Sequence, residues 1–125
     1  MTEVRPLQPG DVDQVLRNLR PADREEISAL VGEHEVAAAV RLSAKHSQQA
    51  WALAAGDEVI AVFGVAPVLG VPGVGSPWCV GTPAIKRVER AFMRESRAYI
   101  PRMLAVFPYL VNVVDPRNTR AVGIT

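Results

Sequence analysis

Apolar residues recur with helical spacing over the first third of the chain. A short edge strand comes before them, over "EVRPLQPGD", with prolines at its end. Asp11 is placed to cap the first helix, and Gln14, three residues on, completes a capping box. The pattern then predicts a second helix that opens at Pro21 and ends at Gly32, and a third helix over residues 33–47.

The spacing changes near residue 49, where the apolar residues become nearly continuous. The segment "QQAWALAAGDEVIAVFGVAPVLG" predicts two strands joined by a tight turn at Gly56 and Asp57. Residues 59–65 have almost no polar position, which is typical of a central strand covered on both faces. A glycine- and proline-rich loop, "GVPGVGS", leads to a brief strand over "PWCVGT".

A long helix is predicted after this strand, with Thr82 as its N-cap and Pro83 as its first residue. Pro101 lies on its outer side and is expected to bend the helix without breaking it. The Ser96 hydroxyl is expected to bond back to a main-chain carbonyl. The inner face is predicted to hold Ile85, Val88, Phe92, Ser96, Tyr99 and Met103, and the outer face Lys86, Arg87, Arg90, Arg94 and Arg97.

The chain closes with a strand over "YLVNVVDP" and the start of another helix over "RNTRAVGIT". The order is therefore strand, three helices, three strands, helix, strand. This order predicts one α+β (mixed α/β) domain over residues 1–125, with a central sheet and flanking helices.

The composition narrows the possible partners and compartments. Hydrophobic residues make up 49% of the chain and charged residues 22%, with a formal net charge of +1. This balance gives no reason to expect nucleic acid as a partner, and the basic helix face is interpreted as a solvated surface. Charge begins at Glu3, so no signal peptide is expected, and no apolar run approaches the roughly 20 residues of a membrane span.

Candidate metal and redox chemistry is sparse. Cys79 is the single cysteine, which excludes an internal disulfide and a thiolate cluster, and its apolar strand predicts a buried, inert thiol. His34 and His46 are too far apart along the chain to share a metal, so no metal site is expected. Trp51 and Trp78 are interpreted as core anchors.

Several segments together carry a family resemblance: "VRPLQPGDVDQVLRNL", "GDEVIAVFGVAP", "PWCVGTPAIKRVERAFMRESR" and "LVNVVDPRNTRAV". In this order they resemble the Gcn5-related N-acetyltransferase (GNAT) fold. More narrowly, the chain looks like the internal virion protein A family of short-tailed phages, a branch of that fold. The combination of "W-x-x-G-T" with "F-M-R-E-S-R" is its most specific part.

The resemblance also implies a cofactor position. In the GNAT fold an Arg/Gln-x-x-Gly-x-Gly/Ala turn before the long helix receives the pyrophosphate of acetyl-CoA on its main-chain N–H groups. Here the stretch is "CVGTPAIKRV", where Pro83 has no N–H and Ile85 is expected to lie where the diphosphate would be. The residues that the resemblance places at a cofactor are Gly81, Thr82, Lys86, Arg87 and Asn118.

Asn118 corresponds to an asparagine near the pantetheine arm, although capping of the last helix by Asp115 is the favoured interpretation of that cluster. No catalytic residue is assigned, because Glu58 lies in a turn and the tyrosine proton donor of the fold would follow the chain's last residue. The two closing strands of the fold are also expected to be missing, which would leave residues 110–114 with an unpaired side open to a partner, including a second copy.

Three functions follow from these observations. The first is a phage virion-associated or morphogenesis protein on a degenerate acetyltransferase scaffold, without a cofactor, whose partners are other virion or assembly proteins. Its compartment would be the host cytoplasm or the virion. The alternative is an active acetyl-CoA-dependent N-acetyltransferase. The third is a small anion- or nucleic-acid-contacting module that uses the arginine-rich helix face.

Overall fold

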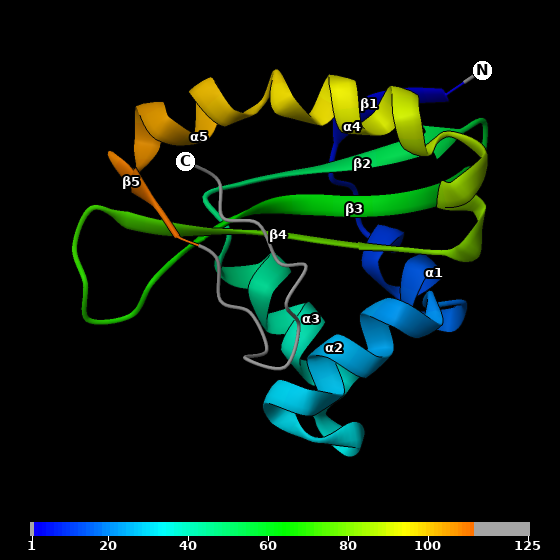
Figure 1. Cartoon of the computed structure of the whole chain (residues 1–125), viewed down its shortest axis with the longest axis horizontal. Helices are drawn as coiled ribbons and strands as arrows, with labels where there is room; N and C mark the ends of the chain where they lie inside the picture. The colour runs from blue at the N-terminus through cyan, green and yellow to red at the C-terminus, as the bar shows by residue number, and fades with distance from the viewer. Residues whose placement is uncertain (1, 112–125) are drawn as a thin grey trace.

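The computed structural model describes residues 2–111 and contains one five-stranded sheet with helices on both faces (Figure 1). The strands are β1 (Thr2–Pro6), β2 (Gln49–Ala55), β3 (Glu58–Pro67), β4 (Val74–Gly81) and β5 (Tyr109–Leu110). The helices, with η marking 3₁₀ segments, are α1 (Asp11–Arg17), α2 (Pro21–Val31), η1 (Glu33–Glu35), α3 (Val36–His46), η2 (Pro83–Arg87), α4 (Glu89–Arg97) and α5 (Ile100–Val106). The predicted order of elements and the α+β class are confirmed.

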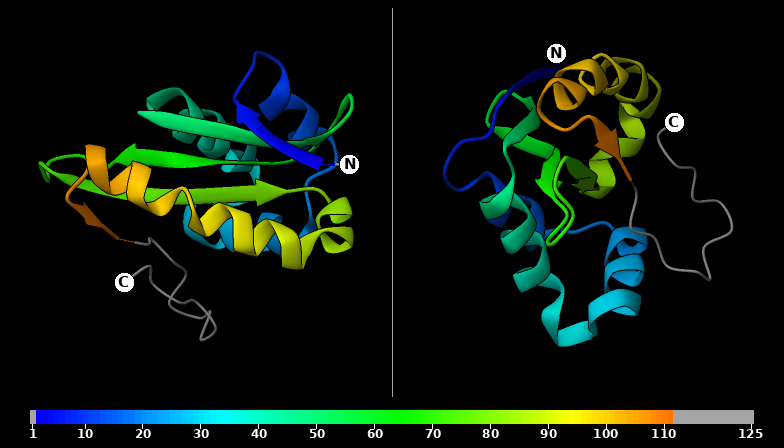
Figure 2. Two further views of the ribbon diagram at one scale, coloured as in Figure 1. Left: turned by 90° about the horizontal axis from the view of Figure 1, so that it is seen from above. Right: turned by 90° about the vertical axis from the view of Figure 1, so that its left-hand side faces the viewer.

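The strands lie in the sheet in chain order, β1-β2-β3-β4-β5. The first four strands are antiparallel neighbours, whereas β5 pairs with β4 in parallel. A parallel neighbour needs a crossover, and the η2–α4–α5 segment supplies it. Figure 2 shows this segment on one face of the sheet and α1, α2 and α3 on the other.

Strand β3 is the centre of the sheet, as its sequence predicts. Residues 59–65 are all buried, and the predicted two-residue turn at Gly56 and Asp57 joins β2 to β3. Hydrophobic side chains of the sheet form two cores, one on each face. The core under α4 and α5 includes Trp51, Phe63, Phe92, Met103 and Phe107, and the core under α1–α3 includes Val15, Leu19, Val36, Val40 and Val62.

The predicted capping box of α1 is wrong. The N-cap is Gly10, at φ +89°, and no side chain caps the helix. Asp11 instead accepts the Gln8 N–H at 2.7 Å and forms an ion pair with Arg5 at 2.7 Å. Gln14 Oε1 accepts the Val59 N–H at 2.6 Å. Because the sheet lies next to the start of α1, both side chains form tertiary hydrogen bonds instead of capping the helix.

The predicted second helix is confirmed, with Pro21 at its start and Gly32 at its end. The third is divided into η1 and α3, and Val36 and Val40 of α3 are buried. The strand predicted over residues 77–82 begins earlier, at Val74, so the loop before it is shorter than expected.

The long helix predicted after Thr82 is correct in its faces but not in its continuity. It is divided into η2, α4 and α5, with interruptions at Val88 and at residues 98–99. The second interruption precedes Pro101, which has no N–H to continue the ladder, so the helix breaks rather than bends. Ile85, Phe92 and Met103 are buried, as predicted, and all five basic residues of the outer face are exposed.

The start of the last predicted strand is confirmed by β5, with the rest outside the described residues. Gly75 of β4 lies against Phe107, and a Cβ there would come within 2.6 Å of the ring. Asp115, Asn118 and the last predicted helix also lie outside residues 2–111. None of the described helices is both long and apolar enough to cross a membrane.

Candidate functional site

The junction between β4 and η2 is the position that the sequence marks for a cofactor. Gly81 is the last residue of β4, and its N–H donates to Asp23 Oδ2 at 2.8 Å. Its carbonyl accepts the Arg20 N–H, also at 2.8 Å. Both polar groups of this edge residue are therefore bonded to the start of α2.

Thr82 is tied to the sheet in a similar way. Its N–H and its hydroxyl both donate to the carbonyl of Ile60, at 2.9 and 3.2 Å, and the residue is buried. Thr82 is the N-cap of η2 and Pro83 its first residue, as predicted, but the Thr82 side chain makes no capping hydrogen bond to this helix. The hydroxyl reaches β3 instead, because β4 ends directly beside that strand.

Asp23 is the residue of this site that the sequence did not reveal. It is 6% exposed, and its second carboxylate oxygen accepts from Arg20 Nη2 at 2.7 Å. In the sequence it looks like an ordinary acid in the first turn of a helix. The one local signal is its spacing of three residues from Arg20, which pairs the two side chains but does not show that β4 lies beside them.

Ile85 lies on the buried face, as its helical spacing predicts. The side chain is 5% exposed and belongs to the core under α4 and α5, so it does not occupy an exposed position at the junction, where it was expected to take the place of a diphosphate. Its N–H donates to the Thr82 carbonyl at 3.0 Å. Pro83, directly after Thr82, has no N–H to offer.

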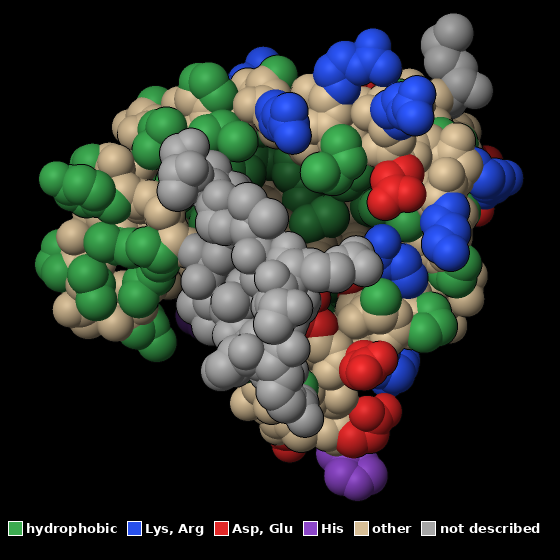
Figure 3. Space-filling model, in the orientation of Figure 1, with side chains coloured by type: hydrophobic (Ala, Val, Ile, Leu, Met, Phe, Trp, Pro, Cys, Tyr) green, Lys and Arg blue, Asp and Glu red, His purple; other side chains and the backbone are tan. Residues whose placement is uncertain are grey.

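The two basic residues of the predicted cofactor set lie on the surface. Lys86 and Arg87 are exposed on η2, and Arg87 Nη2 lies 3.3 Å from Glu58 Oε2 in an exposed ion pair. Glu58 is exposed next to the β2–β3 turn, as its sequence position suggests. Figure 3 shows a hollow with hydrophobic side chains in its floor below a row of Lys and Arg side chains.

Cys79 is exposed, so the predicted burial of its thiol is wrong. Part of the residue faces solvent, but protein atoms around the sulfur desolvate the thiol and, with the charge of Asp23, raise its pKa to about 12. The thiol is therefore protonated at neutral pH, which makes it a poor nucleophile.

The part of the chain that the structure describes contains no candidate metal-binding site. No group of three or more His, Cys, Asp or Glu side chains in residues 2–111 could hold an ion, and His34 and His46 are exposed.

Trp51 is buried, as predicted. Trp78 is partly buried, and its Nε1 donates to Ser47 Oγ at 2.7 Å. The Ser96 hydroxyl donates back to the Met93 carbonyl, as expected.

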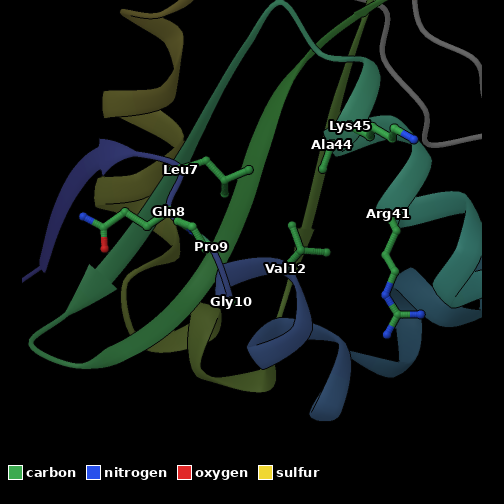
Figure 4. Close-up of a pocket in the computed structure, with 8 residues that line it drawn as sticks. All are labelled: Leu7, Gln8, Pro9, Gly10, Val12, Arg41, Ala44 and Lys45. Atoms are coloured by element: carbon green, nitrogen blue, oxygen red, sulfur yellow. The ribbon is translucent and has the colours of Figure 1, made fainter.

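A separate cavity of about 350 Å³ lies between the β1–α1 connection and α3 (Figure 4). Its cationic residues are Arg41 and Lys45, and Arg41 Nε is held by Asp13 at 3.0 Å. The remaining lining residues are Leu7, Gln8, Pro9, Gly10, Val12 and Ala44. None of the residues that line this cavity belongs to the β4–η2 junction, so the two are separate sites.

Solved structures resemble this fold, although no protein-family model matches the sequence and no curated protein matches it. A GNAT-family acetyltransferase from Brucella melitensis in complex with acetyl-CoA has a TM-score of 0.59 at 19% identity, over 96% of this chain and 80% of that one. A GNAT-family acetyltransferase from Streptococcus pneumoniae has a TM-score of 0.55 at 16% identity, over 94% and 77%.

A Gcn5-related N-acetyltransferase from Kribbella flavida has a TM-score of 0.53 at 18% identity, over 85% of this chain and 67% of that one. The chain spans 66% of a further acetyltransferase-like structure, with a TM-score of 0.60. At these identities the likeness concerns the fold alone. The chain has the GNAT fold, as its sequence resemblance implies.

Proposed function

We propose that this protein uses the GNAT fold as a scaffold for protein contacts and does not carry out acetyl transfer. The single observation that carries the proposal is the Asp23 carboxylate bonded to the Gly81 N–H at the end of β4. The partners proposed are other proteins of a phage particle or of its assembly. The sequence resemblance to the phage internal virion protein A family supports this partner class.

The hydrogen bonds at the junction oppose a diphosphate. The Asp23 carboxylate, which is also paired with Arg20, already accepts from the Gly81 N–H, so this amide is not available to another anion. The N–H groups of Thr82, Ile85 and Val88 donate to main-chain carbonyls. With Pro83 unable to donate, this stretch has few main-chain donors left for an anion.

The second candidate function is acetyl-CoA-dependent N-acetyltransferase activity. The observation that favours it is the match to a GNAT structure that holds acetyl-CoA. Lys86, Arg87 and Arg90 are exposed around the first turn of α4, where helix geometry leaves N–H groups unpaired and favours anions. On this candidate the cofactor residues are Gly81, Thr82, Lys86, Arg87 and Asn118.

Isothermal titration of the full chain with CoA and with acetyl-CoA separates the two candidates. We expect no saturable binding below the millimolar range. Binding in the micromolar range would overturn the scaffold proposal and support the enzyme.

Charge reversal then locates any binding that is seen. Lys86→Glu at the junction is compared with Lys45→Glu on α3, because both side chains are exposed and only Lys86 belongs to η2. A loss confined to Lys86→Glu would assign the coenzyme to the β4–η2 junction. The partner class is tested separately, by mass spectrometry of purified phage particles, where absence of the protein would contradict a virion role.

A further inference from the structure

One end of the molecule carries an exposed surface of large hydrophobic side chains. It is formed by the β3–β4 loop, the end of α5 and the β5 segment, and we name it the apolar end. Its members are Leu69, Val71, Leu104, Val106, Tyr109 and Val111. Leu69 is 89% exposed and Tyr109 70% exposed, values that are unusual for side chains of this size.

The two halves of the apolar end are adjacent in space. The Tyr109 N–H donates to the Gly73 carbonyl at 3.1 Å, and the Val111 N–H donates to the Gly75 carbonyl at 2.9 Å. These bonds hold β5 against the start of β4, directly after the loop that carries Leu69. Figure 3 shows the resulting concentration of hydrophobic side chains on the side where Figure 1 places the β3–β4 loop, α5 and β5.

The surface is also free of charge over long stretches of sequence. Residues 59–85, which include the whole β3–β4 loop, contain no Asp, Glu, Lys or Arg, and neither do residues 103–111. A typical protein surface has charged residues at about a quarter to a third of its positions. Contiguous apolar patches of this kind mark interaction sites.

The β3–β4 loop has a defined shape. The Val68 N–H donates to the Val74 carbonyl at 3.0 Å, the Val71 N–H to the Val68 carbonyl at 3.2 Å, and the Val74 N–H to the Val71 carbonyl at 3.3 Å. A loop already held by its own hydrogen bonds loses little conformational entropy when it docks. Leu69 is therefore presented on a preformed projection.

We propose that the apolar end is the contact between two copies of this chain in a two-fold dimer. An uncharged apolar surface is complementary to another one, and a second copy presents the same surface; a charged partner would lose hydration there without gaining an opposite charge. A two-fold contact also needs each copy to supply both sides of the interface. In such a dimer the projecting loop of each copy contacts the α5–β5 face of the other copy, so the same contact is made twice.

The exposure of these side chains agrees with such a dimer. All six are between 42% and 89% exposed, so each copy presents a hydrophobic surface that a second copy can bury. The inference does not depend on coenzyme binding, because the apolar end shares no residue with the β4–η2 junction.

Sedimentation equilibrium of the full chain, without CoA in the buffer, tests the proposal. We expect a concentration-dependent shift from the 13.5 kDa monomer to twice that mass. Leu69→Asp on the loop and Val106→Asp on α5 are each expected to raise the dimer dissociation constant at least tenfold. Leu42→Asp on α3 is the matched control, because Leu42 is 53% exposed but lies outside the apolar end, and it should leave the constant unchanged.

Three results would overturn the proposal. They are a monomer up to several hundred micromolar, an equal effect of Leu42→Asp, and co-sedimentation with phosphatidylcholine–phosphatidylglycerol vesicles without a dimer, which would assign the surface to lipid. Circular dichroism of each variant checks that the protein is still folded. Leu69→Asp is the safest variant in this respect, because its side chain packs on almost nothing in the monomer.

Discussion

The two faces of the sheet are attached to their helices by different kinds of interaction. On the face of α1–α3, side-chain hydrogen bonds join helices to strands at defined points: Gln14 to the Val59 N–H, Asp23 to the Gly81 N–H, and Ser47 to Trp78 Nε1. On the face of α4 and α5, no side-chain hydrogen bond within residues 2–111 joins either helix to a strand. Aromatic packing holds these helices instead.

Four rings form the centre of that second face. Trp51 and Phe63 of the sheet have centroids 5.4 Å apart, and Tyr99 lies 4.7 Å from Trp51 and 5.5 Å from Phe63. Phe92 meets Phe63 edge to face at 5.6 Å. Ring packing is strong but weakly directional compared with a hydrogen bond. The α1–α3 face is therefore fixed in register, whereas the α4–α5 face is fixed mainly by how well its surfaces fit.

The largest expected effect comes from breaking the aromatic face. Phe63→Ala removes the ring that contacts three others and leaves a cavity in a buried position, which should lower the free energy of unfolding by about 3–5 kcal/mol. Urea unfolding followed by tryptophan fluorescence measures it. Met93→Ala, at a 52% exposed position on α4, should change this free energy by less than about 0.5 kcal/mol. A loss below 1 kcal/mol for Phe63→Ala would show that the rings do not hold this face.

The next effect comes from removing a polar tie on the opposite face. Asp23→Ala should cost about 2–4 kcal/mol, because it leaves the buried Gly81 N–H without an acceptor and Arg20 without its ion pair. The matched control is Asp13→Ala, which breaks an exposed pair with Arg41 and should cost less than about 1 kcal/mol. Equal losses in both variants, measured by urea unfolding, would contradict the distinction between a buried tie and a surface pair.

The smallest expected effect depends on pH and concerns Asp11. Burial raises the pKa of Asp11, but hydrogen bonds from Arg5 and the Gln8 N–H, with the charge of Arg5, outweigh burial and bring the pKa below its ordinary value of 3.8. The unfolded chain therefore takes up the proton first as the pH falls. The stabilisation is complete well above pH 3.8 and is lost as the pH falls through the lower pKa of the folded state.

Asp11→Asn tests this dependence. The variant should be less stable than the wild type by about 1–2 kcal/mol at pH 7, and the difference should shrink as the pH falls below 4. Urea unfolding at a series of pH values from 7 to 2.5 measures both proteins under the same conditions. A difference that stays constant over this range would mean that the Asp11 charge contributes nothing.

The features that the sequence predicts correctly depend on local spacing. Continuous apolar residues at 59–65 predict the buried strand, and helical spacing places Phe92 and Met103 inside. The Gly56–Asp57 turn follows from residue type alone. Such features can be predicted from the sequence because the residues that cause them lie within the same short segment of the chain.

The site was predicted less well because its determinants are not local. Gln14 suits a capping box, yet it bonds to Val59, which is 45 residues away in the chain. Asp23 reaches Gly81 across 58 residues, and no pattern near either residue shows that they meet. The exposure of Cys79 likewise depends on how far a neighbouring strand extends along β4: within the described residues β5 pairs only with Val74 and Gly75, and the composition of β4 cannot give that information.

The charge-free stretch at residues 59–85 has a consequence for how the chain reaches its fold. Charged gatekeepers normally interrupt strands of this kind and keep unfolded chains apart, and here none is present between Glu58 and Lys86. During synthesis the α1–α3 segment emerges first and can cover one side of the new strands, but the other side must wait for α4 and α5. Recovery from denaturant should therefore fall steeply as the protein concentration rises, since neighbouring chains compete with the late helices for the same bare strand surface.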